Sequence, residues 1–171
     1  FNPWPDDDGV TRRVPMLAEY DGAYYESLSM AMIRLGLGLP PVIPGFPQDK
    51  FWSKDYHGLE WVDMGSVRIP VDNFVTALVP YRGKQGSFQY ISATDVLHGN
   101  APLDQLKNKI VLVGTTAPGL YDLRAVPVAS VYPGVEIHAN LIAGMLDGSI
   151  KQRPPYVLSA EVVLLLFSGI G

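Results

Sequence analysis

The chain has 171 residues, of which 47% are hydrophobic and 18% are charged. This length is enough for one ordinary core and too short for two comfortable ones. The formal net charge of −4 leaves no positive excess with which to neutralise nucleic-acid phosphates. The sequence contains no cysteine, which excludes disulfides, thiolate catalysis, Cys-ligated zinc and iron–sulfur clusters. We therefore expect one domain with no nucleic-acid partner and no cofactor.

The first third of the chain predicts a strand, a tight turn and a helix. Residues 10–20 alternate apolar or β-branched residues with charged ones, as a strand does, and Asp21-Gly22 supplies turn chemistry that tolerates positive φ. Ser27 can then cap a helix that stops at Gly36. Residues 39–63 are rich in proline, glycine and aromatics without any period, which predicts a long irregular excursion. This excursion is either a lid or partner-facing surface, or an insertion packed down by its own aromatics.

The middle of the chain predicts short strands and one buried strand. Strand candidates cover residues 66–70, 74–81 and 88–91, a short helix capped at Ser92–Asp95 runs to His98, and a linker turn covers 103–108. The strongest local prediction is Lys-Ile-Val-Leu-Val-Gly at 109–114, because a continuous β-branched run that ends in glycine is typical of a strand buried on both faces.

A helix is predicted over residues 134–146, with Gly148 as its C-terminal stop. Its predicted apolar face comprises Val135, His138, Ala139, Ile142, Met145 and Leu146. A buried strand together with a covering helix indicates an α/β fold, in which a mixed, largely parallel sheet is flanked by helices.

The C-terminal segment is apolar and follows a basic stretch. Every residue from Val162 to Phe167 is apolar, whereas a buried amphipathic helix would keep a polar face. The segment therefore predicts the start of a transmembrane helix, with Lys151 and Arg153 at headgroup level; a buried terminal helix is the alternative, and Glu161 favours it. The run is shorter than the ~20 residues that span a bilayer.

Phe1 is preceded by no initiator methionine or signal core. We accordingly expect a piece of a longer protein, with a domain at 1–150 and a juxtamembrane segment at 151–171.

The best candidate site follows the predicted buried strand. Ligand crevices of open α/β sheets lie outside the carboxyl ends of the strands, which is where Thr115 and Thr116 stand. Asp122 adds a carboxylate, and the helix at 134–146 adds His138 and Asn140. We expect these five residues to line a ligand crevice. The glycine spacing fits neither a phosphate loop nor a dinucleotide fingerprint.

Catalysis has weaker support. His138 could act as a general base oriented by Asp122, but a lone histidine on an apolar helix face is usually a core residue. His57, His98 and His138 lack the spacing of a metal site, and no Gly-x-Ser-x-Gly elbow is present. A periplasmic hydrolase that uses Asp122 and His138 remains an alternative. A purely structural dimerisation module with its interface at residues 52–61 is another.

Three arginines form a second candidate site. Arg12, Arg13 and Arg82 could converge as an anion clamp, because guanidinium groups suit carboxylate or phosphate ligands. The alternative is that they are solvated or pair with Asp6–Asp8 or Asp72.

Five motifs together resemble one known family. They occur in the order seen in the second type of CHASE domain, an extracellular sensory domain associated with cyclases and histidine kinases. The motifs are Asp-Asp-Asp-Gly-Val-Thr-Arg-Arg-Val-Pro at 6–15, Ser-Leu-Ser-Met-Ala at 27–31, Pro-Tyr-Arg-Gly at 80–83, Lys-Ile-Val-Leu-Val-Gly-Thr-Thr-Ala at 109–117 and Gly-Val-Glu-Ile-His-Ala-Asn at 134–140. The resemblance covers nearly the whole chain, and the last two motifs are the most specific.

The resemblance implies a sensor on the periplasmic side of the bacterial inner membrane. Such domains are followed by membrane helices that lead to a cytoplasmic output, commonly a class three adenylate or guanylate cyclase, a histidine kinase or a serine/threonine kinase. The implied signal is a small molecule or an envelope protein, and the full-length receptor is expected to be a homodimer. The family carries no established catalytic residues, so no enzyme activity is implied for this segment. The opening strands and helices of the family should precede Phe1.

Overall fold

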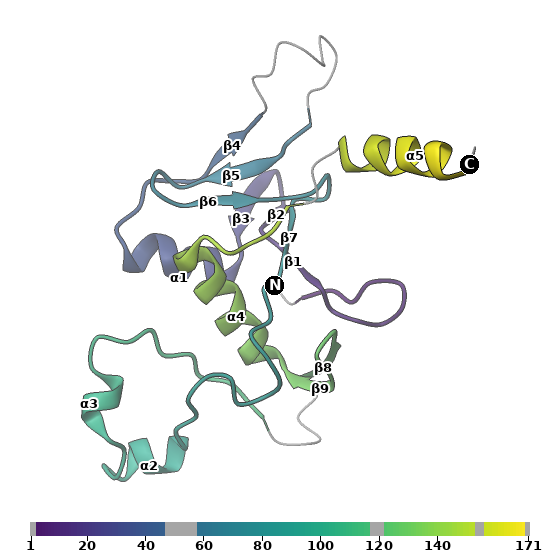
Figure 1. Ribbon diagram of the computed structural model, residues 1–171. Helices are drawn as coiled ribbons and strands as arrows, with labels where there is room; N and C mark the ends of the chain where they lie inside the picture. Colours follow the sequence, from purple (N-terminus) through teal and green to yellow (C-terminus); the bar gives the residue numbers. More distant parts are fainter. Residues whose placement is uncertain (1–2, 47–57, 117–121, 153–155, 170–171) are drawn as a thin grey trace.

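The computed structural model describes residues 3–46, 58–116, 122–152 and 156–169. Its helices and strands are shown in Figure 1. The strands are β1 (Arg13–Pro15), β2 (Leu17–Tyr20), β3 (Ala23–Glu26), β4 (Ile43–Gly45), β5 (Trp61–Asp63), β6 (Arg68–Pro70), β7 (Thr76–Leu78), β8 (Leu123–Val126) and β9 (Ala129–Pro133). The helices are α1 (Leu28–Gly36), α2 (Ala93–Leu97), α3 (Leu103–Leu106), α4 (Gly134–Asp147) and α5 (Tyr156–Gly169).

The strands form small antiparallel sheets. These are β1–β7, β2–β3, β4–β5–β6 and β8–β9. The one parallel pairing among the described residues is an isolated bridge between Val10 and Ala125. The fold is therefore mixed α/β as expected, but the prediction of a largely parallel sheet is wrong. Connections that return through short turns, such as β2 to β3, favour antiparallel neighbours, because a parallel pair needs a long crossover.

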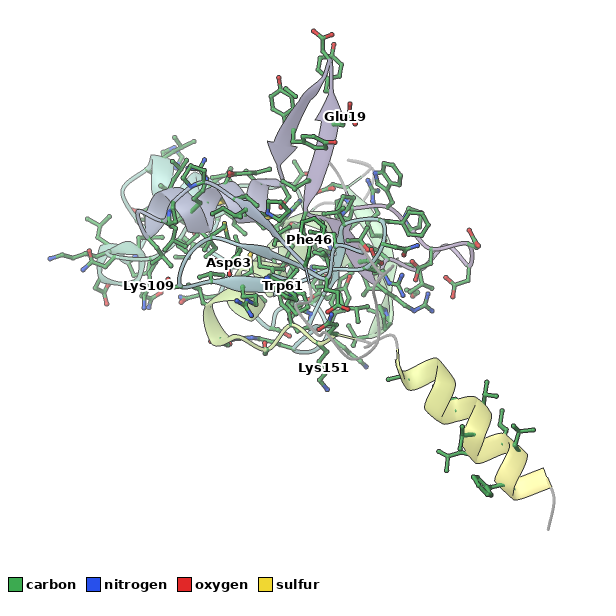
Figure 2. The ribbon with its side chains drawn as sticks, turned by 90° about the horizontal axis from the view of Figure 1, so that it is seen from above. Glu19, Phe46, Trp61, Asp63, Lys109 and Lys151 are labelled. Carbon is green, nitrogen blue, oxygen red and sulfur yellow. The ribbon has the colours of Figure 1, made fainter. Side chains whose placement is uncertain are left out.

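The predicted strand at 10–20 divides at Met16. Arg13 to Pro15 pair with β7, whereas β2 pairs with β3 across the turn, so Met16 is the point where the chain changes partner. Asp21 and Gly22 both have positive φ, 51° and 73°, as a two-residue hairpin turn requires. The resulting β2–β3 hairpin, on which Glu19 lies, projects from the body of the molecule (Figure 2).

The excursion predicted at 39–63 contains ordered structure at both ends. Ile43–Gly45 pairs with Trp61–Asp63, which in turn pairs with Arg68–Pro70. The absence of a sequence period is explained by the strand length, since three residues are too few to show alternation. Residues 47–57 lie outside the described residues. Most of the interface at 52–61, which the dimerisation-module alternative proposed, therefore also lies outside them.

The core lies between the strands and the helices α1 and α4. Its fully buried side chains include Met16 and Met64 from the strand region, Met30 from α1, and Ile137 and Leu141 from α4. Ser27 caps α1 as predicted, accepting a hydrogen bond from the Met30 amide. Gly148 ends α4 with φ 62° in the left-handed region, also as predicted.

The predicted buried face of α4 is correct only in part. Leu146 is 50% exposed, whereas Glu136 and Asn140, both polar, are buried. The prediction used apolar spacing alone. Polar side chains of α4 can also be buried, because they have hydrogen-bond partners.

Residues 82–116 differ most from the prediction. Residues 88–91 and 109–114 form no strand, and Ile110, Val111 and Val113 are 46%, 52% and 91% exposed. A β-branched run specifies strand propensity, but a strand also needs a neighbour to receive its backbone hydrogen bonds. The predicted short helix is present as α2, and α3 replaces part of the linker turn at 103–108. Figure 1 shows α2 and α3 on an excursion away from the body.

Helix α5 extends away from the body in both views (Figures 1 and 2). The side chains from Val162 to Phe167 are 48–76% exposed, so the alternative of a buried terminal helix is wrong. Within the part of the chain that the structure describes, no helix has both the length and the apolar character that a bilayer crossing requires.

Candidate functional site

A hollow of about 170 Å³ opens where the starts of α1 and α4 meet the segment that follows α3. The residues that line it come from five parts of the chain. They are Pro3, Leu28, Leu112, Val113, Gly114, Asp122, Gly134, Val135 and His138. The wall is mostly apolar, and Asp122 and His138 are its two titratable side chains. An apolar wall with few polar groups is also found in small-molecule sites, but those usually measure about 300–1,000 Å³, so this hollow suits only a small ligand.

Two glycines allow the close packing at the hollow. A Cβ on Gly134 would lie 2.4 Å from Oδ1 of Asp122, and a Cβ on Gly114 would lie 2.5 Å from Cβ of Val135. The Gly134 amide also donates to the Asp122 carbonyl at 2.8 Å. The Asp122 carboxylate therefore lies against the first residue of α4, where the positive end of the helix dipole favours an anion.

His138 joins the two helices at the base of the hollow. Its Nδ1 lies 2.9 Å from Oγ of Ser29 in α1, and the side chain is 9% exposed. Because Nδ1 is occupied by Ser29, Nε2 is the ring nitrogen left to meet a ligand. Burial lowers the pKa of His138, and the nearby Asp122 carboxylate opposes this shift only in part. The neutral imidazole is thus favoured at the site.

The structure brings some of the predicted crevice residues together. Asp122 and His138 both line the hollow, and Thr115 and Thr116 follow its Gly114 wall, with Thr115 exposed and Thr116 half-buried. Asn140 has a different position. Its amide donates to Oη of Tyr132 and its Oδ1 accepts from the Arg82 amide, so it holds the chain after β7 against α4.

Glu136 is a buried residue that the sequence reasoning did not single out. It is 2% exposed, and its carboxylate accepts hydrogen bonds from the Gly86 and Ser87 amides and from Oη of Tyr90 at 2.6 Å. Burial, together with this bond, raises the pKa of the Tyr90 phenol. Glu136 and Asn140 therefore connect two of the motifs. Asn140 binds the Arg82 backbone within Pro-Tyr-Arg-Gly, and Glu136 binds the backbone at 86–87 that follows it.

The three arginines of the proposed anion clamp are each engaged by carboxylates. Arg12 pairs with Asp6 at 2.9 Å and Asp8 at 2.7 Å, Arg13 pairs with Asp72 at 3.0 Å, and Arg82 pairs with Asp147. The Arg12 guanidinium lowers the pKa of Asp8 to about 2.

Arg12 also lines a second, larger hollow of about 310 Å³. It lies there beside Leu78, Val79, Pro80, Tyr81, Pro127 and Lys151. Two carboxylates neutralise Arg12, so Lys151 is the remaining cationic side chain among the residues that line this hollow.

The hollow at the start of α4 is suited to binding rather than to hydrolysis. Ser29 and His138 resemble a nucleophile and its base, but Ser29 is fully buried, so a substrate carbonyl cannot reach its hydroxyl. Within the described ranges, no three His, Asp or Glu side chains gather in a way that could hold a metal ion.

Comparison with known proteins decides the family. The family model of the CHASE2 domain matches residues 1–171. The chain belongs to the CHASE2 domain family. A search of curated proteins and of solved structures finds no significant match. CHASE2 domains are extracellular sensory domains rather than catalytic ones.

Proposed function

We propose that this CHASE2 domain is the periplasmic sensor of a bacterial inner-membrane receptor, and that its signal binds in the hollow at the start of α4. The receptor output is a class three adenylate or guanylate cyclase; a histidine or serine/threonine kinase is the alternative. The observation that carries the proposal is the position of Asp122 and His138 in an otherwise apolar hollow of a sensory domain.

The position of α4 supports this proposal. Its first turn borders the hollow, and its last turn leads through Gly148 and the buried Ile150 to Lys151 and the apolar helix α5. A ligand that binds two arrangements of α4 with different affinity would shift the population between them. In the proposed receptor, α5 begins the membrane segment and transmits the change in the arrangement of α4 to the cytoplasmic output.

Thermal melting of the full chain in detergent tests whether the domain senses a small molecule. The compounds are amino acids, dicarboxylates, amines, sugars and nucleosides. A ligand at 100 times its Kd adds about 2.7 kcal/mol to the free energy of unfolding, which is a clear rise in melting temperature. If no compound changes the melting temperature and the chain instead retains an envelope protein on affinity resin, the signal is a protein.

These 171 residues contain no cysteine, so a thiol introduced here reports the location of this domain. Leu97 is 84% exposed on α2, so Leu97→Cys introduces one accessible thiol. A membrane-impermeant maleimide should label this variant in spheroplasts as fully as in lysed cells. Labelling that occurs only after lysis would place the domain on the cytoplasmic side and contradict the proposal.

A further inference from the structure

The side chains that line the hollow at the start of α4 give it a negative charge. Asp122 and His138 are its two titratable groups, and burial favours the neutral imidazole of His138, so Asp122 supplies the charge. The chain between Lys109 and Asp122, part of which forms another wall, contains no charged residue. None of the ion pairs among the described residues includes Asp122. A carboxylate beside an apolar wall attracts a cation more strongly than it would in water, because the local dielectric constant is lower.

The start of α4 is closed to a second anion. A helix N-terminus usually favours negative charge, but here the Asp122 carboxylate already occupies that position. A Cβ on Gly134, the first residue of α4, would overlap Oδ1 of Asp122. Asp122 would repel another carboxylate or a phosphate brought to the same place. The hollow therefore discriminates against anionic ligands.

His138 can add a hydrogen bond to a cation that Asp122 attracts. Its Nδ1 lies 2.9 Å from Oγ of Ser29. A hydroxyl both donates and accepts, so Ser29 is compatible with the tautomer that carries the proton on Nδ1. In that tautomer Nε2 is an acceptor, and a nearby cation favours it. An ammonium group has several N–H donors and can bond to the carboxylate and to Nε2 at the same time.

The size and the apolar lining of the hollow define the rest of the ligand. The volume is about 170 Å³, and an apolar cavity of about 150 Å³ holds one benzene molecule. Leu28, Leu112 and Val135 line it and suit a short alkyl chain, which a hydrated metal ion does not offer. We propose that the signal is a small primary amine, whose ammonium group binds Asp122 and His138 and whose alkyl part packs on the apolar wall. This inference rests on the proposed function, because it names the ligand class of the same hollow.

Compounds of matched size test the charge preference on the full chain in a non-ionic detergent. They are n-butylamine, n-butanol, butyrate and norvaline, which is n-butylamine with a carboxylate on the carbon that bears the amine. Amide chemical shifts of Gly114 and Gly134 measure binding at constant ionic strength, and a detergent-only sample corrects for partitioning into micelles. The affinity for so small a ligand should lie in the micromolar to millimolar range. Butylammonium should bind at least about tenfold more tightly than the other compounds, because Asp122 attracts its charge and repels the carboxylates.

Asp122→Asn separates the ammonium contact from burial of the alkyl chain. It should reduce the preference for butylammonium over n-butanol to less than about twofold. Asp104→Asn removes an exposed carboxylate on α3 and should keep the preference. Butyrate that binds the wild type as tightly as butylammonium does, or an Asp122→Asn variant that retains the preference, would overturn the assignment of an amine. The comparison of compounds on the wild type does not depend on the folding of any variant.

The same measurements distinguish failure of this inference from failure of the proposed function. A dicarboxylate, sugar or nucleoside could raise the melting temperature and lose affinity in Asp122→Asn while no amine binds. That result would refute the amine and leave the binding of a signal in the hollow intact. A wild-type chain whose Gly114 and Gly134 amides respond to no compound of any class would refute both.

Discussion

Glu136 shows how a single buried carboxylate can hold two segments together. Its carboxylate accepts hydrogen bonds from the Gly86 and Ser87 amides at 3.1 and 3.0 Å. Among the ion pairs of the described residues, none includes Glu136. Hydrogen bonds that involve a charged group contribute more than neutral ones, and loss of one partner leaves the other unsatisfied. Sequence reasoning missed this role, because an acidic residue in the first turn of a helix is usually explained by the helix dipole alone.

Glu136→Gln should lower the free energy of unfolding by about 1–3 kcal/mol. The neutral amide weakens its hydrogen bonds to the 86–87 amides and to Tyr90. Urea unfolding followed by circular dichroism measures the change, and hydrogen exchange of Gly86 and Ser87 should accelerate with it. Glu19→Gln, on the exposed hairpin, is the matched control. If both variants unfold at the same urea concentration as the wild type, Glu136 does not stabilise the contact between α4 and residues 86–87.

His138 should make the domain less stable in mild acid. Its folded-state pKa lies below the ordinary value near 6.5, because burial disfavours the imidazolium. The unfolded chain therefore binds this proton more readily, so the stabilisation is complete above about pH 6.5 and is lost as the pH falls towards the folded-state pKa.

Thermal melting between pH 7.5 and pH 5.5 tests this pH dependence. We expect a clear fall in melting temperature for the wild type and a smaller fall for His138→Gln. Asp122, the other titratable group that lines the hollow, is present in both proteins, as are the remaining histidines. Parallel pH profiles of the two proteins would show that His138 does not contribute.

At the scale of elements, local signals predicted the helices well. The caps at Ser27 and Ser92 and the stop at Gly148 are each read from a residue and its near neighbours, and all three are present in the structure. The strands were harder to predict, because pairing depends on residues far apart in the chain, such as Arg13 with Leu78. For the same reason the prediction of a buried strand at 109–114 is wrong.

The contact of α4 with the end of β7 gives a prediction about Gly144. A Cβ at this position would lie 2.4 Å from Cγ of Pro80 and 3.2 Å from Cγ1 of Ile150. Gly144→Ala should therefore destabilise the domain by about 1–3 kcal/mol through overpacking. Gly36→Ala, at the open end of α1, should be neutral or stabilising by up to about 1 kcal/mol. Chemical unfolding of both variants tests the contact, and a Gly144→Ala variant as stable as Gly36→Ala would contradict it.

At the scale of the whole molecule, α4 lies between the candidate site and the apolar helix α5. The sequence predicted that Asp122 and His138 would meet near the residues after 114, and they do line one hollow. It placed Asn140 there as well, because apolar spacing cannot distinguish the face of α4 that meets the Arg82 backbone from the face that meets the hollow. The CHASE2 family was recognisable from motif order, which does not depend on correct pairing of the strands.

The claim that the signal binds beside α4 is tested most directly by titration calorimetry. The ligand is the compound that most raises the melting temperature of the full chain, and the proteins are the wild type, Asp122→Asn and Asp104→Asn. Asp104 lies exposed on α3, away from the hollow, and provides the matched loss of a carboxylate. We predict that Asp122→Asn weakens binding at least about tenfold, or 1.4 kcal/mol, and that Asp104→Asn binds like the wild type. Equal affinity of all three proteins would contradict the account.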